Sequence, residues 1–466
     1  MDYLSGPTRQ SNVAFCGAMN RKEFKRKMPK FYITTLGCKV NRFESDAVAM
    51  ALTSLGWSRA EKTFDADVCV INTCTVTGKA SVESRNLIRQ MVRNNPNAKV
   101  VVTGCYAQTE AEEIEKIDGV AAVISHTEKH KTPDYIVALH ETGKAHFSND
   151  RNKSCRETLF HGIDVEVPGT RTRPLLKIQD GCDAFCSYCI VPHTRGRSRS
   201  MKKQEVFQRL KGLGEKGFQE VVLTGIHIGC YGLDLTPKTN FYELLKEMDS
   251  QRAVKRVRLG SMEPMEISNE LIELAVSSPF FCDHFHIPLQ SGDDDVLKRM
   301  KRPYTASRFK ELATLIHRLN PSAAIGADVI IGFPGETQEQ FENTCAFLES
   351  LPLAYLHVFP FSPRERTPAA SLEGRLDGDT LKARTARVRA IGNAAKKRFM
   401  EKAIGTQVEV IVEKERDKKS GRLKGVTSNY IPVQLDGDDK LMNTLVSVTL
   451  TQIHENGYLL GSHKED

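Results

Sequence analysis

Apolar runs and amphipathic segments alternate along the first third of the chain. Three β-branched runs, FYITTLGC, VCVINTC and KVVVTGC, lie between residues 31 and 105, and each ends in a cysteine. The segments between them, ESDAVAMALTSLG and SVESRNLIRQMVRNN, have the apolar spacing of helices. This order predicts a doubly wound α/β domain, in which the carboxyl ends of parallel strands share one edge. Cys38, Cys74 and Cys105 are therefore expected to converge there, the alternative being three unrelated small residues at strand ends.

A second alternating region follows a polar stretch without periodicity. Its apolar runs are PLLKIQ, EVVLTG, KRVRLGS, DHFHIPL, AAIGADVIIGF and LAYLHVFPF, with amphipathic segments such as KKQEVFQRLKGLGEKG between them. Six strand–helix repeats predict a partial (βα)6 barrel. Glycines and polar residues cluster just after these strands, on the face that carries the chemistry in such barrels.

The last part of the chain has a different pattern. Short runs such as TQVEVIVEK, IPVQLDG and TLVSVTLTQI are separated by glycine and Asp-Gly, which predicts a small antiparallel β-barrel. The predicted division is a disordered basic leader (1–29), the α/β domain (30–142), a linker (143–168), the (βα)6 barrel (169–398) and the small β-barrel (401–466).

The positive charge of the chain is concentrated in two segments. The net charge is +8, but residues 1–30 hold seven basic and two acidic side chains, and residues 381–402 hold eight basic and one acidic. The second segment is expected to meet a polyanion such as RNA. A solvated amphipathic helix is the alternative.

Twelve cysteines occur in 466 residues, without the apolar run of a secretory signal. This usage favours metal ligation in a reducing compartment over a disulfide scaffold, and we expect a cytoplasmic protein. No stretch approaches the roughly 18 apolar residues of a membrane span, so no membrane contact is expected.

The segment GCDAFCSYCIVPHTRGRSRS places Cys182, Cys186 and Cys189 in one loop after the first barrel strand. Two interpretations are open. A structural zinc site needs four protein ligands, for which His193 is the close candidate, at an unusual spacing. A 4Fe-4S cluster needs only the three thiolates and leaves one iron open, and its position in the barrel favours it.

Three arginines follow at alternate positions, Arg195, Arg197 and Arg199. They can bind phosphate, steady a cofactor carboxylate or support the barrel rim, and we favour contact with RNA or cofactor. His227, His284 and His286 are interpreted as rim or packing residues.

The three-cysteine motif in this position resembles the radical S-adenosylmethionine superfamily. The resemblance implies that the open iron binds S-adenosylmethionine and that its reductive cleavage gives a 5′-deoxyadenosyl radical. Together with TLGCKVNRFESD, INTCTVTGKA and VVTGCYAQ, the motif resembles the methylthiotransferases, from about residue 31 to the C-terminus. That family implies a second, auxiliary 4Fe-4S cluster on Cys38, Cys74 and Cys105, and a C-terminal TRAM domain that binds RNA.

The motif GCKVN with NTCTVT resembles the branch that methylthiolates threonylcarbamoyladenosine at C2, beside the anticodon of ANN-decoding transfer RNA. The sister branches, which read GCQMN or GCPKN, act on isopentenyladenosine or on a ribosomal-protein aspartate. A zinc-stabilised RNA-binding protein without catalysis is the alternative from another class. Two segments depart from the family pattern. They are NRFES and CIVPHTRG, and the latter contains His193.

The family positions also imply an S-adenosylmethionine pocket at the strand ends. An electron donor such as flavodoxin or ferredoxin is expected as a partner, and the chain is expected to be a monomer or a weak dimer. For each pocket residue the alternative is a helix cap or turn. The implied residues are Thr224, Gly225, Ser261, Glu263, Gln290 and Asp328.

Overall fold

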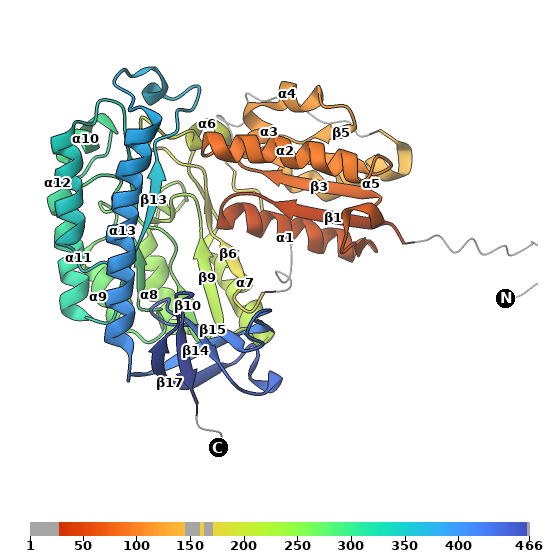
Figure 1. Ribbon diagram of the computed structural model, residues 1–466. Coiled ribbons are helices and arrows are strands. Elements are labelled where there is room, and N and C mark those ends of the chain that lie inside the picture. The colour runs from red at the N-terminus through yellow and green to blue at the C-terminus, as the bar shows by residue number, and fades with distance from the viewer. Residues whose placement is uncertain (1–27, 145–158, 163–170, 464–466) are drawn as a thin grey trace, which may run out of the picture.

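The computed structural model describes residues 28–144, 159–162 and 171–463 (Figure 1). The predicted leader and linker lie almost wholly outside these residues, and the predicted domain limits stay predictions. The described residues form a five-stranded α/β unit, a larger α/β barrel and a small closed β-barrel. No described helix combines the length and apolar character that a membrane crossing requires.

The N-terminal unit is a parallel sheet with strand order β2-β1-β3-β4-β5. Two edge strands, β2 and β5, were not predicted, because they span only two and four residues. The order reverses between β1 and β3, and open α/β sheets bind ligands at such a switch point. The strands are β1 (Lys30–Thr35), β2 (Ser58–Arg59), β3 (Val68–Thr73), β4 (Lys99–Gly104) and β5 (Val120–Val123).

Helices cover both faces of this sheet. On one face Val48 and Leu52 of α1 pack with Ile136 of α5, and on the other Ile88 of α2 packs with Ile114 of α4. This arrangement confirms the predicted doubly wound fold. The helices are α1 (Lys39–Ser54), α2 (Gly78–Asn94), α3 (Cys105–Thr109), α4 (Ala111–Glu115) and α5 (Thr132–Thr142).

The barrel has the six predicted parallel strands, arranged as two sheets, β10-β9-β6 and β11-β12-β13. The isolated bridges Val257↔Phe281 and Ser261↔His286 connect the two sheets. The strands are β6 (Leu175–Lys177), β9 (Glu220–Thr224), β10 (Arg256–Arg258), β11 (His284–His286), β12 (Ala324–Ile331) and β13 (Tyr355–Pro360).

Side-chain alternation separates an apolar outer layer from a polar interior. Ala327 and Val329 of β12 belong to the core shared with the helices, whereas Asp328 between them bonds to histidines of β11 and β13. The helices are α7 (Lys203–Glu215), α8 (Phe241–Gln251), α9 (Asn269–Ser277), α10 (Asp294–Arg299), α11 (Ala306–Leu319), α12 (Gln338–Glu349) and α13 (Gly378–Ala403). The cysteine loop carries β7 (Gln179–Asp180), α6 (Val191–Arg195) and β8 (Arg199–Ser200).

The C-terminal strands close into a barrel in the order β14-β15-β16-β18-β17. One pair, β16 with β18, is parallel, so the prediction of an antiparallel barrel is wrong for that pair. This unit packs against β10, where Arg258 donates to the carbonyl oxygens of Thr427 and Ser428 at 3.0 and 2.8 Å. The strands are β14 (Gln407–Arg416), β15 (Leu423–Thr427), β16 (Pro432–Leu435), β17 (Leu445–Ile453) and β18 (Leu459–Ser462).

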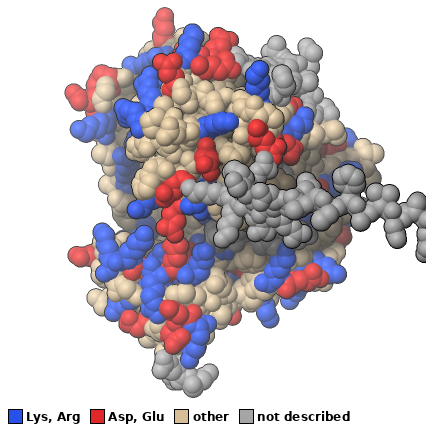
Figure 2. All heavy atoms as spheres, turned by 90° about the vertical axis from the view of Figure 1, so that its right-hand side faces the viewer, with Lys and Arg blue, Asp and Glu red and all other residues tan. Residues whose placement is uncertain are grey.

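Lys and Arg side chains are abundant on the lower part of the face in Figure 2, at the level of the C-terminal barrel, where acidic side chains lie among them. Helix α13 contributes exposed cations at Lys382, Arg389, Lys397 and Arg398. Arg384 of the same helix is buried and binds Glu336, with Nη1 3.0 Å from Oε2. The basic segment predicted from the sequence is therefore exposed only in part.

Candidate functional site

The cysteines that follow β1, β3 and β4 lie at one edge of the N-terminal sheet. The strands are in register there, with Thr35 opposite Asn72 and Thr73 opposite Gly104. Cys38 is the N-cap residue of α1, Cys74 follows β3, and Cys105 begins α3. We call these three cysteines the N-terminal trio.

Two close contacts hold the loop of Cys38 against Cys74. Gly37 has a φ of +97°, and a Cβ at this position would lie 2.9 Å from Cys74 Sγ. Asn41 Nδ2 donates to the carbonyl oxygens of Leu36 and Thr73 at 2.8 and 3.0 Å. A glycine is required here because an added side chain would displace the thiol.

The barrel trio, Cys182, Cys186 and Cys189, lies in the loop between β7 and α6. The Cys182 amide donates to Gly196 at 3.0 Å, which closes the loop, and the Cys189 amide donates to Cys186 at the same distance. Arg302 approaches from the turn before α11, and its Nη1 lies 3.1 Å from Cys186 Sγ. This donor would stabilise a thiolate at Cys186.

The spacing of both trios argues against a single zinc ion. Two thiolates bound to one zinc at about 2.3 Å are at most about 4.6 Å apart. Three groups of described side chains have all their ligand atoms within 4.8 Å of one another, and neither trio is among them. The wider spacing fits a multi-iron cluster with three thiolate ligands.

Burial disfavours the ionised form of a cysteine thiol in each trio. Burial and, to a smaller extent, the neighbouring Cys105 and Cys38 raise the pKa of Cys74 to about 11. Burial, together with the smaller effect of the neighbouring Cys186, raises the pKa of Cys189 to about 12. A bound metal cluster reverses this preference, because coordination deprotonates the thiols.

The histidine considered as a fourth zinc ligand packs elsewhere. The His193 ring meets Phe185 edge-on, with centroids 6.1 Å apart. His227, interpreted from the sequence as a rim or packing residue, instead places Nδ1 3.3 Å from Cys182 Sγ. His227 also forms a compact group with Cys230 and Glu266, two residues to which the sequence assigned no role.

Three of the residues implied for the S-adenosylmethionine pocket lie in two chains of contacts inside the barrel. Ser261 Oγ lies 2.6 Å from His286 Nδ1, and His286 Nε2 lies 3.0 Å from Asp328 Oδ1. Glu263 accepts a hydrogen bond from Arg302, the residue that also contacts Cys186. Glu263 is therefore linked to Cys186 of the barrel trio through a single residue, Arg302.

The other three residues implied for the S-adenosylmethionine pocket lie in different surroundings. Thr224 is buried at the end of β9, and a Cβ at Gly225 would lie 3.0 Å from Gln179 Oε1. Gln290 has a φ of +67°, and its backbone bonds to Asp328 and Ile330 at 2.8 and 2.9 Å. The assignment of all six residues to S-adenosylmethionine stays a prediction.

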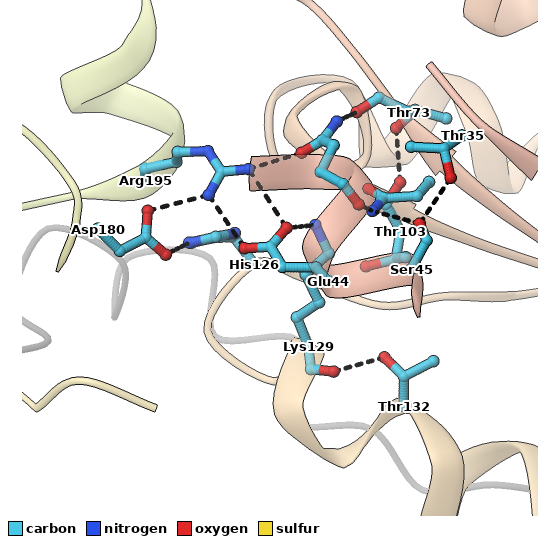
Figure 3. Close-up of polar contacts among 12 residues, drawn as sticks. Thr35, Glu44, Ser45, Thr73, Thr103, His126, Lys129, Thr132, Asp180 and Arg195 are labelled. Atoms are coloured by element: carbon cyan, nitrogen blue, oxygen red, sulfur yellow. Dashed lines mark hydrogen bonds and ion pairs between the residues drawn. The ribbon is translucent and has the colours of Figure 1, made fainter. Parts of the chain in front are cut away.

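Arg195 is buried in an ion cluster between the barrel and the N-terminal unit (Figure 3). Its Nη1 donates to Glu44 at 3.1 Å and to Asp180 at 2.9 Å, and its Nη2 donates to Asn41 at 2.6 Å. The side chain is 1% exposed. The RNA or cofactor contact favoured from the sequence is wrong for Arg195, because protein carboxylates already occupy its guanidinium.

Arg199 and Arg197 have different surroundings. Arg199 is buried, and its Nη2 donates to the Arg195 carbonyl at 2.9 Å, so the sequence interpretation is wrong for it too. Arg197 is exposed, pairs with Asp183 at 3.2 Å and lies over the Phe185 ring. Of the three arginines, Arg197 is the one available to a ligand.

The remaining members of this ion cluster were not found from the sequence. Glu44 binds Lys129 and Lys177, and Asp180 binds Lys177 and His126. Burial alone would raise the pKa of Glu44, but Arg195, Lys129 and Lys177 hold it well below its ordinary value. The available signal was a charged residue on the apolar face of α1, next to Phe43 and Ala47.

Comparisons with known proteins agree with this arrangement. The model of the family described as Uncharacterized protein family UPF0004 matches residues 30–125, and that of the Radical SAM superfamily matches residues 176–348. Threonylcarbamoyladenosine tRNA methylthiotransferase MtaB from Bacillus subtilis is 38% identical over 419 residues, which cover 89% of this chain and 92% of that protein. The protein of the same name from Aquifex aeolicus is 36% identical, with 88% and 97% covered.

More distant relatives have related names. A tRNA-2-methylthio-N(6)-dimethylallyladenosine synthase from Pelotomaculum thermopropionicum is 32% identical, with 91% of this chain and 95% of that protein covered. Among solved structures, the radical S-adenosylmethionine methyltransferase TsrM from Kitasatospora setae has a TM-score of 0.54 at 16% identity, covering 74% of this chain and 77% of that one. At that identity the likeness concerns the fold alone.

Proposed function

The chain belongs to the methylthiotransferase family of radical S-adenosylmethionine enzymes, and we propose that it attaches a methylthio group to C2 of N6-threonylcarbamoyladenosine in transfer RNA. The adenosine is the one 3′ of the anticodon in ANN-decoding transfer RNAs. The observation that carries the proposal is the presence of two three-cysteine sites, each too widely spaced for one ion, on units joined by a buried ion cluster.

The barrel trio would hold one 4Fe-4S cluster, and the N-terminal trio would hold a second, auxiliary one. When bound, the clusters would supply the electron that cleaves S-adenosylmethionine and the sulfur that is transferred. Because each trio offers three thiolates, a 4Fe-4S cluster held there would keep one iron open to another ligand.

The protein side chains would position the reactants and exclude water. Arg302 bridges Cys186 and Glu263, so it couples the barrel trio to a residue implied for the S-adenosylmethionine pocket. Ser261, His286 and Asp328 present a hydrogen-bonded row to the barrel interior. Such pre-organised polar groups fix the orientation of a bound cofactor.

The C-terminal barrel and the exposed cations of α13 would bind the anticodon stem through its phosphates. The target adenine would be unstacked from its loop to reach the sites. We further propose that the enzyme acts in the cytoplasm, where its transfer RNA substrate is found, and that flavodoxin or ferredoxin supplies its electrons. We propose that the enzyme acts on transfer RNA as a monomer or weak dimer.

Anaerobic reconstitution with iron and sulfide tests the two-cluster assignment. We expect about eight irons per chain, and about four in each variant that lacks one trio. Replacing the barrel trio by alanine should abolish cleavage of S-adenosylmethionine. Replacing the N-terminal trio should preserve cleavage and abolish methylthiolation. Bound zinc without cleavage would contradict the proposal.

Mass spectrometry of transfer-RNA nucleosides tests the substrate. A strain that lacks the gene should lose methylthio-threonylcarbamoyladenosine and regain it on complementation. Loss of the methylthio form of isopentenyladenosine would identify the enzyme with its sister branch. In the same strain, mass spectrometry of ribosomal proteins tests the other branch, which would be identified by loss of a methylthio group from an aspartate.

A further inference from the structure

A cavity of about 500 Å³ lies between the start of α1, the inner side of the β6-β9-β10 sheet and strand β14. Its volume is within the range of small-molecule pockets, roughly 300–1,000 Å³. Half of the residues that line it are cations, and we call it the basic pocket. These are Lys39, Arg42, Arg171, Arg173, Arg258 and Lys414.

Three of the cations are already paired within the protein. Arg171 binds Asp46 at 3.0 Å, Arg173 binds Glu413 at 3.0 Å, and Arg258 binds Glu220 at 2.8 Å. Within the described part of the chain, Lys39, Arg42 and Lys414 have no ion-pair partner, and Glu415 is the one unpaired carboxylate on the wall. The pocket is thus prepared for an anion.

The wall of the basic pocket continues into the barrel interior. The Arg258 guanidinium lies over the Tyr430 ring, 5.0 Å from its centroid, and Tyr430 meets His284 with centroids 4.6 Å apart. His284 Nε2 lies 2.8 Å from the Tyr355 hydroxyl. The basic pocket therefore lies beside the barrel interior, with this row of packed side chains as their common wall.

The pocket also adjoins the N-terminal trio. Lys39 directly follows Cys38, and Arg42 lies one helical turn further along α1. In adenine, C2 and the carbon that bears N6 flank the same ring nitrogen. If C2 faces the N-terminal trio, a group attached to N6 lies within reach of these side chains.

We infer that the basic pocket binds the free carboxylate of the threonylcarbamoyl group through Lys39 and Arg42. The inference rests on the proposed function and names the residues that determine its substrate specificity. An isopentenyl group in the same place would desolvate the cations without pairing them. A site built to bind a charged group rejects an analogue that lacks it far more strongly than an apolar pocket can.

The test uses reconstituted holoenzyme and anticodon hairpin RNAs with unmodified adenosine, threonylcarbamoyladenosine or its methyl ester. Fluorescence anisotropy under anaerobic conditions gives Kd, and methylthiolation gives kcat/KM. The wild-type enzyme should bind the free acid roughly tenfold to a hundredfold more tightly than the ester. The variants K39Q and R42Q should lose this preference and keep the wild-type Kd for the ester.

Two matched controls each remove one charge elsewhere in the same unit. Arg59 and Lys116 are exposed and lie outside the basic pocket, so the single variants R59Q and K116Q should keep the wild-type preference. Iron content measured on each variant identifies any loss of the cluster next to Lys39. R42Q is the safer of the two variants in this respect, because Arg42 is further from Cys38.

Three other outcomes would contradict either the inference or the proposed function. Equal wild-type affinity for acid and ester would overturn the inference, while methylthiolation of the acid RNA would leave the proposed function standing. Equal weakening of all three RNAs by K39Q and R42Q would assign the pocket to backbone phosphates and would also overturn it. Wild-type activity on an isopentenyladenosine hairpin alone would contradict the proposed function itself.

Discussion

Arg195 Nη1 lies 3.1 Å from Glu44 Oε1, and this contact joins two units whose cysteines are far apart in the sequence. Glu44 is six positions after Cys38, and Arg195 is six positions after Cys189. Asn41, halfway along the first interval, accepts a further bond from Arg195 at 2.6 Å. The relative position of the two trios is therefore set by buried polar contacts rather than by a linker.

Replacing Arg195 by methionine should destabilise the protein by about 3–5 kcal/mol, because it removes a cation that binds both buried carboxylates, Glu44 and Asp180, and leaves Lys129 and Lys177 to balance them. The measurement is the shift in the denaturation midpoint of the reconstituted enzyme. Arg197→Met is the matched control, since Arg197 is exposed and its pair with Asp183 is worth at most about 1 kcal/mol. Equal shifts for the two variants would contradict the assigned role of Arg195.

The ion cluster should also make stability depend on pH. Burial lowers the pKa of His126 to about 4, against the opposing effect of Asp180, from an ordinary value of 6.5. Between these values the unfolded chain binds more protons than the folded one, so stability falls as pH drops from 6.5 to 4. The loss attributable to His126 is about 3 kcal/mol.

This slope is measured by denaturation at several pH values and compared with His126→Gln. Glu44 and Asp180 have folded pKa values held well below their ordinary values, so their stabilisation is lost only at lower pH. The variant should therefore flatten the decline above pH 4 and leave the steeper acid transition. Parallel curves for both proteins would refute the role of His126.

Arg302→Met should impair the barrel trio selectively, because Arg302 is the donor to Cys186 and also holds Glu263. Loss of such an outer partner typically reduces metal-site function by roughly 10–100-fold. We expect that decrease in S-adenosylmethionine cleavage, together with a lower cluster potential in a potentiometric titration. Lys310→Met, at an exposed position of α11, should change neither quantity.

Gly37→Ala should empty the auxiliary site. The new Cβ would lie 2.9 Å from Cys74 Sγ, at a φ of +97° that alanine rarely adopts. About four of the eight expected irons should remain, with cleavage of S-adenosylmethionine retained and methylthiolation lost. Gly56→Ala is the control: its φ is also positive, at +86°, but nothing lies within 4 Å of the added atom. A full iron content in Gly37→Ala would contradict the predicted packing.

The sequence predicted the strands that carry the chemistry, because their hydrophobic runs and terminal cysteines are local features. It did not predict the function of Glu44, whose partner Arg195 is 151 positions away. Lys39 belongs to the motif GCKVN, yet its place in a pocket depends on β14, which begins at Gln407. Arg195 and Arg199 were misassigned because a basic sequence pattern does not reveal which of its side chains become buried.

The ion cluster also has a consequence for the order of assembly on the ribosome. Lys129 and His126 are synthesised long before Lys177, Asp180 and Arg195, and N-terminal units generally fold first. We therefore expect the N-terminal sheet to pair Glu44 with Lys129 before the barrel has been synthesised. We expect Lys177 and Arg195 to complete the ion cluster on Glu44 only when the barrel folds against this unit.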